Sequence, residues 1–145
     1  MRISTKGRYA LRTLIDLAEH PADGYISLKE ISARQNISKK YLEQIIPVFH
    51  SAGIVSANRG PQGGYKLAKD PSAYTVGDIL RLTEGPLTPV DCAIQNPVEC
   101  PRSGECATLP MWQGLAKVIN EYLDRYTLQD LIDSHLSRST DNYVI

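Results

Sequence analysis

The stretch SLKEISARQNISKKYLEQ, residues 27–44, contains two start signals for helices in close succession. Ser27 is followed three residues later by Glu30, the spacing of a capping box, and this pair predicts a short helix that runs to Gln35. Ser38 is the next residue of a type that caps helices, and two residues separate it from Gln35. Two short helices joined by such a turn have the proportions of a helix-turn-helix.

The second of these helices has an apolar stripe at helical spacing. The stripe consists of Leu42, Ile45, Ile46 and Phe49. Pro47 lies in the same segment, and a proline inside a helix removes one backbone hydrogen bond at a cost of about 3 kcal/mol. We therefore expect the helix either to bend at Pro47 or to lose its regular form near Ile46.

The flanking residues complete a winged helix. Upstream, residues 8–20 have apolar side chains on one helical face. Downstream, Gly53 ends the second helix, and two strand-like segments, 54–58 and 65–68, enclose the Gly-rich turn RGPQGG. A helix-turn-helix followed by a β-hairpin is a winged helix, so the predicted fold class is mainly α with a small β-hairpin wing.

Charge is divided unevenly between the two halves of a chain whose formal net charge is zero. Residues 1–70 contain eleven Lys or Arg and six Asp or Glu, a net charge of +5, whereas residues 71–145 contain five and ten, a net charge of −5. A basic half suggests contact with a polyanion, and the alternative is a chance segregation of solvated charges. With the winged-helix topology, the charge favours double-stranded DNA as a partner.

Polar side chains gather where a winged helix would meet DNA. The N-terminal end of a recognition helix enters the major groove, where Gln can pair with adenine, Glu can accept from cytosine, and lysines meet phosphates. Arg59 lies at the hairpin tip, a position suited to a narrow minor groove. Each residue alone could be an ordinary surface residue. The predicted DNA-binding set is Ser38, Lys39, Lys40, Tyr41, Glu43, Gln44, Arg59, Gly60 and Pro61.

The second half contains a long loop between helices. Thr75 and Asp78 form another capping pair, and the helix that they open ends at Gly85. Residues 86–108 then have no periodicity, and Thr127 with Asp130 caps a last short helix. We expect three parts: a winged-helix domain (1–85), a cysteine-containing loop (86–108), and a C-terminal helical part (109–145).

The helix that begins near residue 109 has a broad apolar stripe, with apolar residues three and four positions apart. One explanation is packing on its own domain, and the other is a partner helix with coiled-coil-like spacing. Because winged-helix proteins often bind two half-sites, we expect a homodimer. The predicted interface residues are Trp112, Leu115, Ile119 and Tyr122.

All three cysteines lie in the loop, at positions 92, 100 and 106. The sequence has no signal peptide and no run long and apolar enough for a membrane span, so we expect a cytoplasmic protein without a membrane partner. In a reducing compartment, clustered thiols more often bind metal or do redox chemistry than form disulfides. Intervals of seven and five intervening residues fit neither the usual zinc pairs nor a thioredoxin pair. An iron–sulfur cluster usually has four ligands, so three cysteines leave one position open.

Several motifs together resemble the IscR-type iron–sulfur cluster regulators, a family of winged helix-turn-helix transcription factors. They are MRISTKGRYALR at the start, ISKKYLEQ (37–44), NRGPQGGYKL (58–67), VGDILRLTEG (76–85) and three cysteines before a Trp-bearing helix. The resemblance covers nearly the whole chain. It implies a homodimeric bacterial repressor that binds palindromic operators and controls cluster-assembly genes, with cluster-donor proteins as further partners.

The resemblance also assigns roles to residues. It implies DNA contacts at Tyr41, Glu43, Gln44, Arg59 and Pro61, with the glutamate contributing to discrimination between operator classes. It implies cluster ligation by Cys92, Cys100 and Cys106, with [2Fe-2S] favoured over [4Fe-4S].

The fourth cluster ligand stays unassigned. The family's histidine, three residues after the last cysteine, is replaced by Leu109, and the acidic residue of related nitric-oxide sensors is replaced by Arg8.

Two other functions remain open. Cysteine-metabolism repressors share the fold and the YLEQ motif, but the three-cysteine loop is not part of their pattern, so we expect them to resemble this chain less. A winged-helix repressor of cysteine or sulfur metabolism, or a sensor of thiol or nitrosative stress without a stable cluster, is one alternative. A protein-interaction module that regulates a metabolic enzyme is the other. We do not expect an enzyme, because no residues suggest a nucleophile–base pair or a catalytic metal site.

Overall fold

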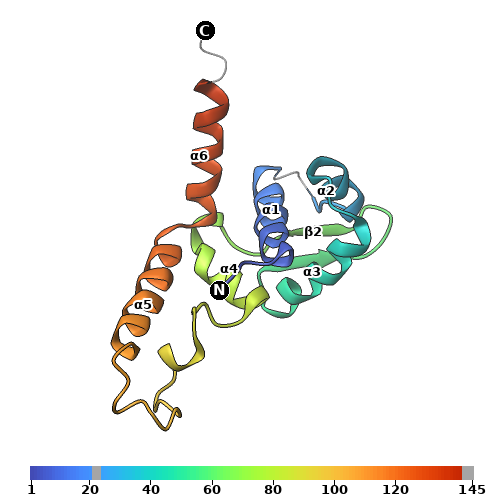
Figure 1. The fold of residues 1–145 in the computed structure, drawn as a ribbon. Coiled ribbons are helices and arrows are strands. Elements are labelled where there is room, and N and C mark those ends of the chain that lie inside the picture. Colours follow the sequence, from blue (N-terminus) through green and yellow to red (C-terminus); the bar gives the residue numbers. More distant parts are fainter. Residues whose placement is uncertain (21–23, 142–145) are drawn as a thin grey trace.

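The computed structural model describes residues 1–20 and 24–141 of the chain. The described residues form a mainly helical structure with one two-stranded antiparallel sheet (Figure 1). The helices are α1 (Thr5–Glu19), α2 (Leu28–Gln35), α3 (Lys39–Ser51), α4 (Val76–Glu84), α5 (Leu109–Arg125) and α6 (Leu128–Asp141). The strands are β1 (Val55–Asn58) and β2 (Gly64–Leu67), and short 3-10 turns occupy Pro71–Ala73 (η1) and Asp91–Ala93 (η2). The expected fold class, a helix-turn-helix followed by a hairpin wing, is confirmed.

The main core lies between α1, α2, α3 and the wing. Leu14, Ile31, Leu42 and Phe49 are fully buried in it, which matches the apolar stripe expected for each helix. The capping box of Ser27 and Glu30 is present, and the Ser38 side chain accepts from the backbone N–H of Tyr41. Local capping signals therefore begin α2 and α3 where the sequence predicts.

Pro47 does not end the recognition helix. α3 continues through it to Ser51, so of the two expected alternatives the one in which regular structure stops near Ile46 is wrong. Pro47 lies on the exposed side of the helix. The carbonyl of Glu43, which would have accepted the missing N–H four residues on, belongs to the same side and can bind water instead.

A second apolar cluster joins α4 to the C-terminal helices. Val76, Leu80 and Leu87 are buried there, and Ile119, Leu123 and Leu131 pack against them. The backbone N–H of Val76 donates to Tyr126 and that of Leu128 donates to Tyr74, so the α5–α6 corner is fastened to the start of α4.

Helix α6 is longer than the short helix expected, and its first turn carries the predicted Thr127–Asp130 capping contacts. Leu128 at its start is fully buried in the main core, and Ile132 is also buried. The division of the chain at residues 85 and 108 stays a prediction. No helix of residues 1–20 and 24–141 combines the length and apolar character needed to cross a membrane.

Candidate DNA-binding surface and cysteine loop

The turn between α2 and α3 is built to hold the start of α3. Asn36 ends α2 in the left-handed conformation (φ 53°), which Asn tolerates better than most residues. The side chain of Ile37 is buried, and its carbonyl accepts a hydrogen bond from the Ser32 hydroxyl at 2.6 Å. Ser38 then caps α3. The position of the first turn of α3 relative to α2 is therefore determined by both packing and hydrogen bonds.

A buried carboxylate fastens α2 to α1. The Asp16 side chain is fully buried and accepts two hydrogen bonds from Nε and Nη2 of Arg34, at 3.0 and 2.7 Å, and one from the Gln35 amide at 2.9 Å. The hydrogen bond to Asp16 raises the pKa of Arg34, because the carboxylate favours the charged guanidinium. This contact was not predicted from the sequence, although an acidic residue among the apolar positions of α1 was a visible signal.

Tyr41 has a structural contact as well as a predicted DNA contact. It is half-buried, and its ring meets that of Tyr9 edge-on, with 5.3 Å between the centroids. The Arg12 guanidinium lies over the Tyr9 ring, 5.1 Å from its centroid. The same guanidinium donates a hydrogen bond to the backbone carbonyl of Gln35. Helix α1 thus supports the recognition helix directly.

The remaining predicted DNA-binding residues are all exposed. On α3 and its cap they are Ser38, Lys39, Lys40, Glu43 and Gln44, and on the wing they are Arg59, Gly60 and Pro61. A groove of about 370 Å³ lies between α3 and the wing, and Pro47, His50 and Arg59 contribute to its lining. Of the predicted DNA-binding residues only Arg59 lines this groove, which joins the wing to the C-terminal half of α3.

The wing is held at its base by a third segment. Ile26 and Tyr65 exchange two backbone hydrogen bonds of 2.8 Å, which adds a bridge to the β1–β2 pair. Gly64 makes this possible, because a Cβ there would overlap the backbone of Ile26. Strand β2 is therefore paired with β1 on one side and with Ile26 on the other, and this base supports the hairpin tip that carries Arg59.

The three cysteines lie in the loop between α4 and α5, at the end of the molecule away from α2 and the wing (Figure 1). All three are free thiols; Cys92 lies in η2, Cys100 is exposed, and Cys106 precedes the first turn of α5. Within the described ranges, no group of three or more His, Cys, Asp or Glu side chains lies close enough together to hold a metal ion. The structure brings the cysteines to one loop but does not bring the thiols together.

Cys106 has the environment of a reactive thiol. Its Sγ lies 3.3 Å from the Thr108 hydroxyl, and this hydrogen bond, followed by the backbone N–H groups of Thr108 and Leu109 and the charge of Arg102, lowers the pKa of the thiol. Low thiol pKa values occur at helix N-termini and near cationic side chains, and the thiolate is the form that binds metal. Soft sulfur donors of this kind fit an iron–sulfur cluster, whereas Leu109 itself offers no ligand.

Comparison with known proteins supports the fold and the function class. The model of the Rrf2 family, described as an iron-dependent transcriptional regulator, matches residues 3–134. The regulator CymR of Bacillus subtilis is 42% identical over 131 residues, covering 90% of this chain and 89% of that protein. IscR of Yersinia pseudotuberculosis is 37% identical over 134 residues, covering 92% and 80%. The solved structure of T. potens IscR has a TM-score of 0.73 and 39% identity, and the match covers 93% of this chain and 88% of that one.

These matches confirm the resemblance to IscR-type regulators and correct one expectation. CymR is more similar in overall sequence than Yersinia IscR, so the expectation that cysteine-metabolism repressors resemble this chain less is wrong for the chain as a whole. The relatives are named as transcriptional regulators, which agrees with the expectation that the protein is not an enzyme. With a winged-helix structure and a family model that matches most of its length, the chain belongs to the Rrf2 family of DNA-binding transcriptional regulators.

Proposed function

We propose that the protein is a homodimeric repressor of iron–sulfur cluster assembly genes that senses cluster supply through Cys92, Cys100 and Cys106. The observation that carries the proposal is the presence of three free thiols in one loop between the winged helix and α5. The similarity to IscR proteins over most of the chain supports it.

Operator recognition is assigned to the exposed residues of α3 and the wing. Glu43 and Gln44 have the donor and acceptor groups that read base edges, and Lys39 and Lys40 suit phosphates. Arg59 would enter the minor groove from the hairpin tip. Gly60 and Pro61 shape that tip, and the Ser38 side chain holds the first turn of α3 in place.

Helix α5 is assigned to the dimer interface, but the interface residues differ from those predicted from the sequence. Large apolar side chains remain exposed along one line of the helix: Met111, Leu115, Val118 and Tyr122. Their spacing is that of a coiled-coil seam. Tyr126, just beyond the end of the helix, is exposed as well. Ile119 packs inside its own chain, and Trp112 is half-buried. We therefore place Leu115 and Tyr122 at the centre of the interface and assign Ile119 to the protomer's own core.

The cysteine loop is assigned to the cluster. The three thiolates would hold the cluster, and its occupancy would depend on the cellular supply of clusters. A [2Fe-2S] cluster suits three cysteines and one further ligand. Cys106 is the thiol most ready to ligate, because its hydrogen bonds to Thr108 and Leu109 favour the thiolate. With one position open to a non-cysteine ligand, the group would exchange readily, as a sensor requires.

A second candidate is a repressor of cysteine metabolism, because the global cysteine regulator of B. subtilis, CymR, is 42% identical to this chain. Such a protein could use the same DNA-binding surface and carry no cluster. The two candidates differ in the occupancy of the cysteine loop, and this difference can be measured directly.

Anaerobic purification followed by a visible spectrum and by iron and sulfide counts tests the proposal. Wild-type protein should be coloured, and Cys92→Ala, Cys100→Ala and Cys106→Ala should each lose the absorption and bind DNA like the cluster-free protein. Ser103→Ala, in the same loop but without a thiol, is the matched control and should keep the colour. Wild-type protein that stays colourless after anaerobic reconstitution would reject the cluster and favour the second candidate.

A further inference from the structure

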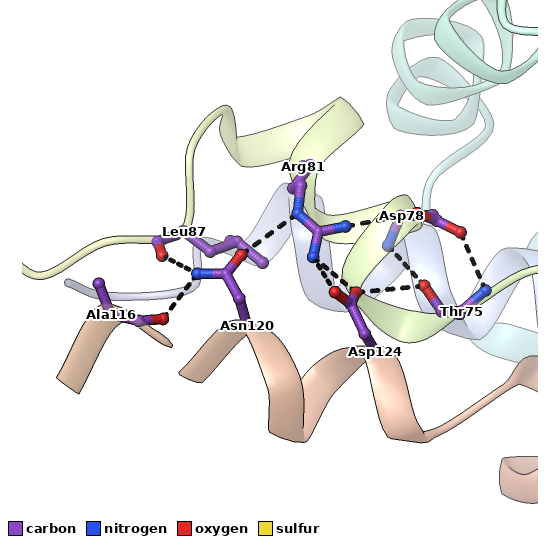
Figure 2. Close-up of polar contacts among 7 residues, drawn as sticks. All are labelled: Thr75, Asp78, Arg81, Leu87, Ala116, Asn120 and Asp124. Atoms are coloured by element: carbon purple, nitrogen blue, oxygen red, sulfur yellow. Dashed lines mark hydrogen bonds and ion pairs between the residues drawn. The ribbon is translucent and has the colours of Figure 1, made fainter. Parts of the chain in front are cut away.

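A polar cluster joins the start of the cysteine loop to α4 and α5 (Figure 2). We call Arg81, Leu87, Asn120 and Asp124 the α4–α5 joint. The Asn120 amide nitrogen donates to the carbonyl of Leu87, where the loop begins, and to that of Ala116, both at 2.8 Å. The Asn120 amide oxygen accepts from Nε of Arg81 at 3.3 Å. One carboxamide therefore connects three segments.

Arg81 carries this contact into α4. Its Nη2 reaches both carboxylate oxygens of Asp124 on α5, at 2.5 and 2.6 Å, and its Nη1 reaches Asp78 at 3.3 Å. The close approach of α4 and α5 depends on Gly77, because a Cβ there would overlap the Asp124 carboxylate. The guanidinium thus pairs with α5 while it contacts the capping box that begins α4.

The last residue of α4, Glu84, lies three residues after Arg81 and fastens α4 to α1. The Glu84 carboxylate accepts hydrogen bonds from the backbone N–H of Ser4 (3.1 Å), the Ser4 hydroxyl (2.5 Å) and the backbone N–H of Gly7 (3.1 Å). A carboxylate at a helix N-terminus is stabilised by the helix dipole. Because α1 supports the recognition helix through Tyr9, α4 forms a continuous physical connection between the cysteine loop and the DNA-binding surface.

We propose that Asn120 and Arg81 are positioning residues that couple occupancy of the cysteine loop to operator affinity, an inference that rests on the proposed cluster-sensing function. Both N–H groups of the Asn120 amide are in use, one on the loop and one within α5. A change in the loop's path at Leu87 therefore leaves one N–H unpaired and lets the amide reorient. Arg81 then loses its amide partner, and its pairing with Asp124 readjusts with it. Two discrete arrangements of this kind are what transmission between distant sites requires.

Asn120→Asp tests the coupling with little change in shape. A carboxylate can still accept from Arg81 but cannot donate to Leu87. Full-length wild type and variant are prepared anaerobically with and without cluster, and the operator dissociation constant is measured for each state by fluorescence anisotropy. The wild-type ratio between the two states is expected to lie in the range of about 5- to 150-fold that is typical of allosteric coupling. The Asn120→Asp ratio should fall towards one, while visible absorption per chain and sedimentation stay at wild-type values.

Lys117→Ala is the matched control, because it removes an exposed ion pair with Glu121 from the same helix without touching the joint. It should keep the wild-type ratio. Asp124→Asn, which frees Arg81 from its α5 partner, is the second variant and should also reduce the ratio if Asn120→Asp does not fold. A coloured, dimeric variant with an undiminished ratio would overturn the joint and leave the proposed function standing. Wild-type protein without cluster, or with equal affinities in both states, would overturn both.

Discussion

Buried side chains hold the elements of the proposed DNA-binding surface in position, and Asp16 is the principal example. Its carboxylate accepts hydrogen bonds from two consecutive residues, Arg34 and Gln35, at the end of α2. The next residues along the chain form the turn that leads into α3. A buried charge is tolerated because each of its oxygens has a partner.

Asp16→Ala is expected to lower the free energy of unfolding by about 3 kcal/mol, the low end of the range for breaking a buried ion pair, because the Arg34 side chain is 32% exposed and can regain water. Urea unfolding followed by circular dichroism measures the change. Glu121→Ala, which removes a carboxylate in an exposed pair, should change stability by less than about 0.5 kcal/mol and serves as the control. Equal effects of the two substitutions would contradict a structural role for Asp16.

Arg59 is the wing residue whose loss should affect both operator affinity and sequence preference. Arg59→Ala should weaken operator binding by about 1–3 kcal/mol and relax preference at the wing's contact site, if this guanidinium reads the groove. Binding to a set of single-base operator variants measures both effects, with Lys117→Ala as a control cation on α5. Unchanged affinity and unchanged preference in Arg59→Ala would reject the role.

Among the helices, α5 presents two different faces. Ala116, Ile119 and Leu123 turn towards α4 and the protomer's own core, whereas Leu115 and Val118 remain 40% and 61% exposed. A helix with apolar residues on both sides needs a second partner for the outer side.

Leu115→Asp should convert the dimer to a monomer, because a charge buried in an apolar seam is costly without a counter-ion. Sedimentation measures the oligomeric state, and circular dichroism should show an unchanged helix content. Lys117→Asp places the same charge on the polar side of α5 and should stay dimeric. A well-folded Leu115→Asp protein that is fully dimeric would mean that another surface joins the protomers.

At the scale of the whole molecule, charge and position separate the two proposed activities. The basic half contains the winged helix, and the acidic half contains the cysteine loop and α5. Figure 1 shows α4 between α1 and α5, with the loop extending away from the wing. Within one protomer, an effect of the loop on DNA therefore passes through packed elements. Of these, α4 is hydrogen-bonded to α1 through Glu84 at its C-terminal end and to α5 through Thr75 at its N-terminal end.

Elements whose signals are local could be predicted from the sequence. Capping boxes act over three residues and apolar periodicity over one or two turns, so α2, α3, α4 and the hairpin could be predicted from neighbouring residues. The exposure of most residues in the proposed DNA-binding set could be predicted for the same reason, because on α3 these residues lie outside the buried apolar stripe.

Contacts between residues far apart in the sequence depend on the packing of the folded chain. Asp16 and Arg34 are 18 positions apart, Leu87 and Asn120 are 33 apart, and Arg81 and Asp124 are 43 apart. No local pattern pairs such residues, because their contact depends on how whole helices pack. The apolar stripe of α5 looked uniform in the sequence for the same reason. Its division into an inner and an outer face followed from the position of α4, which covers one side of the helix and leaves the other open.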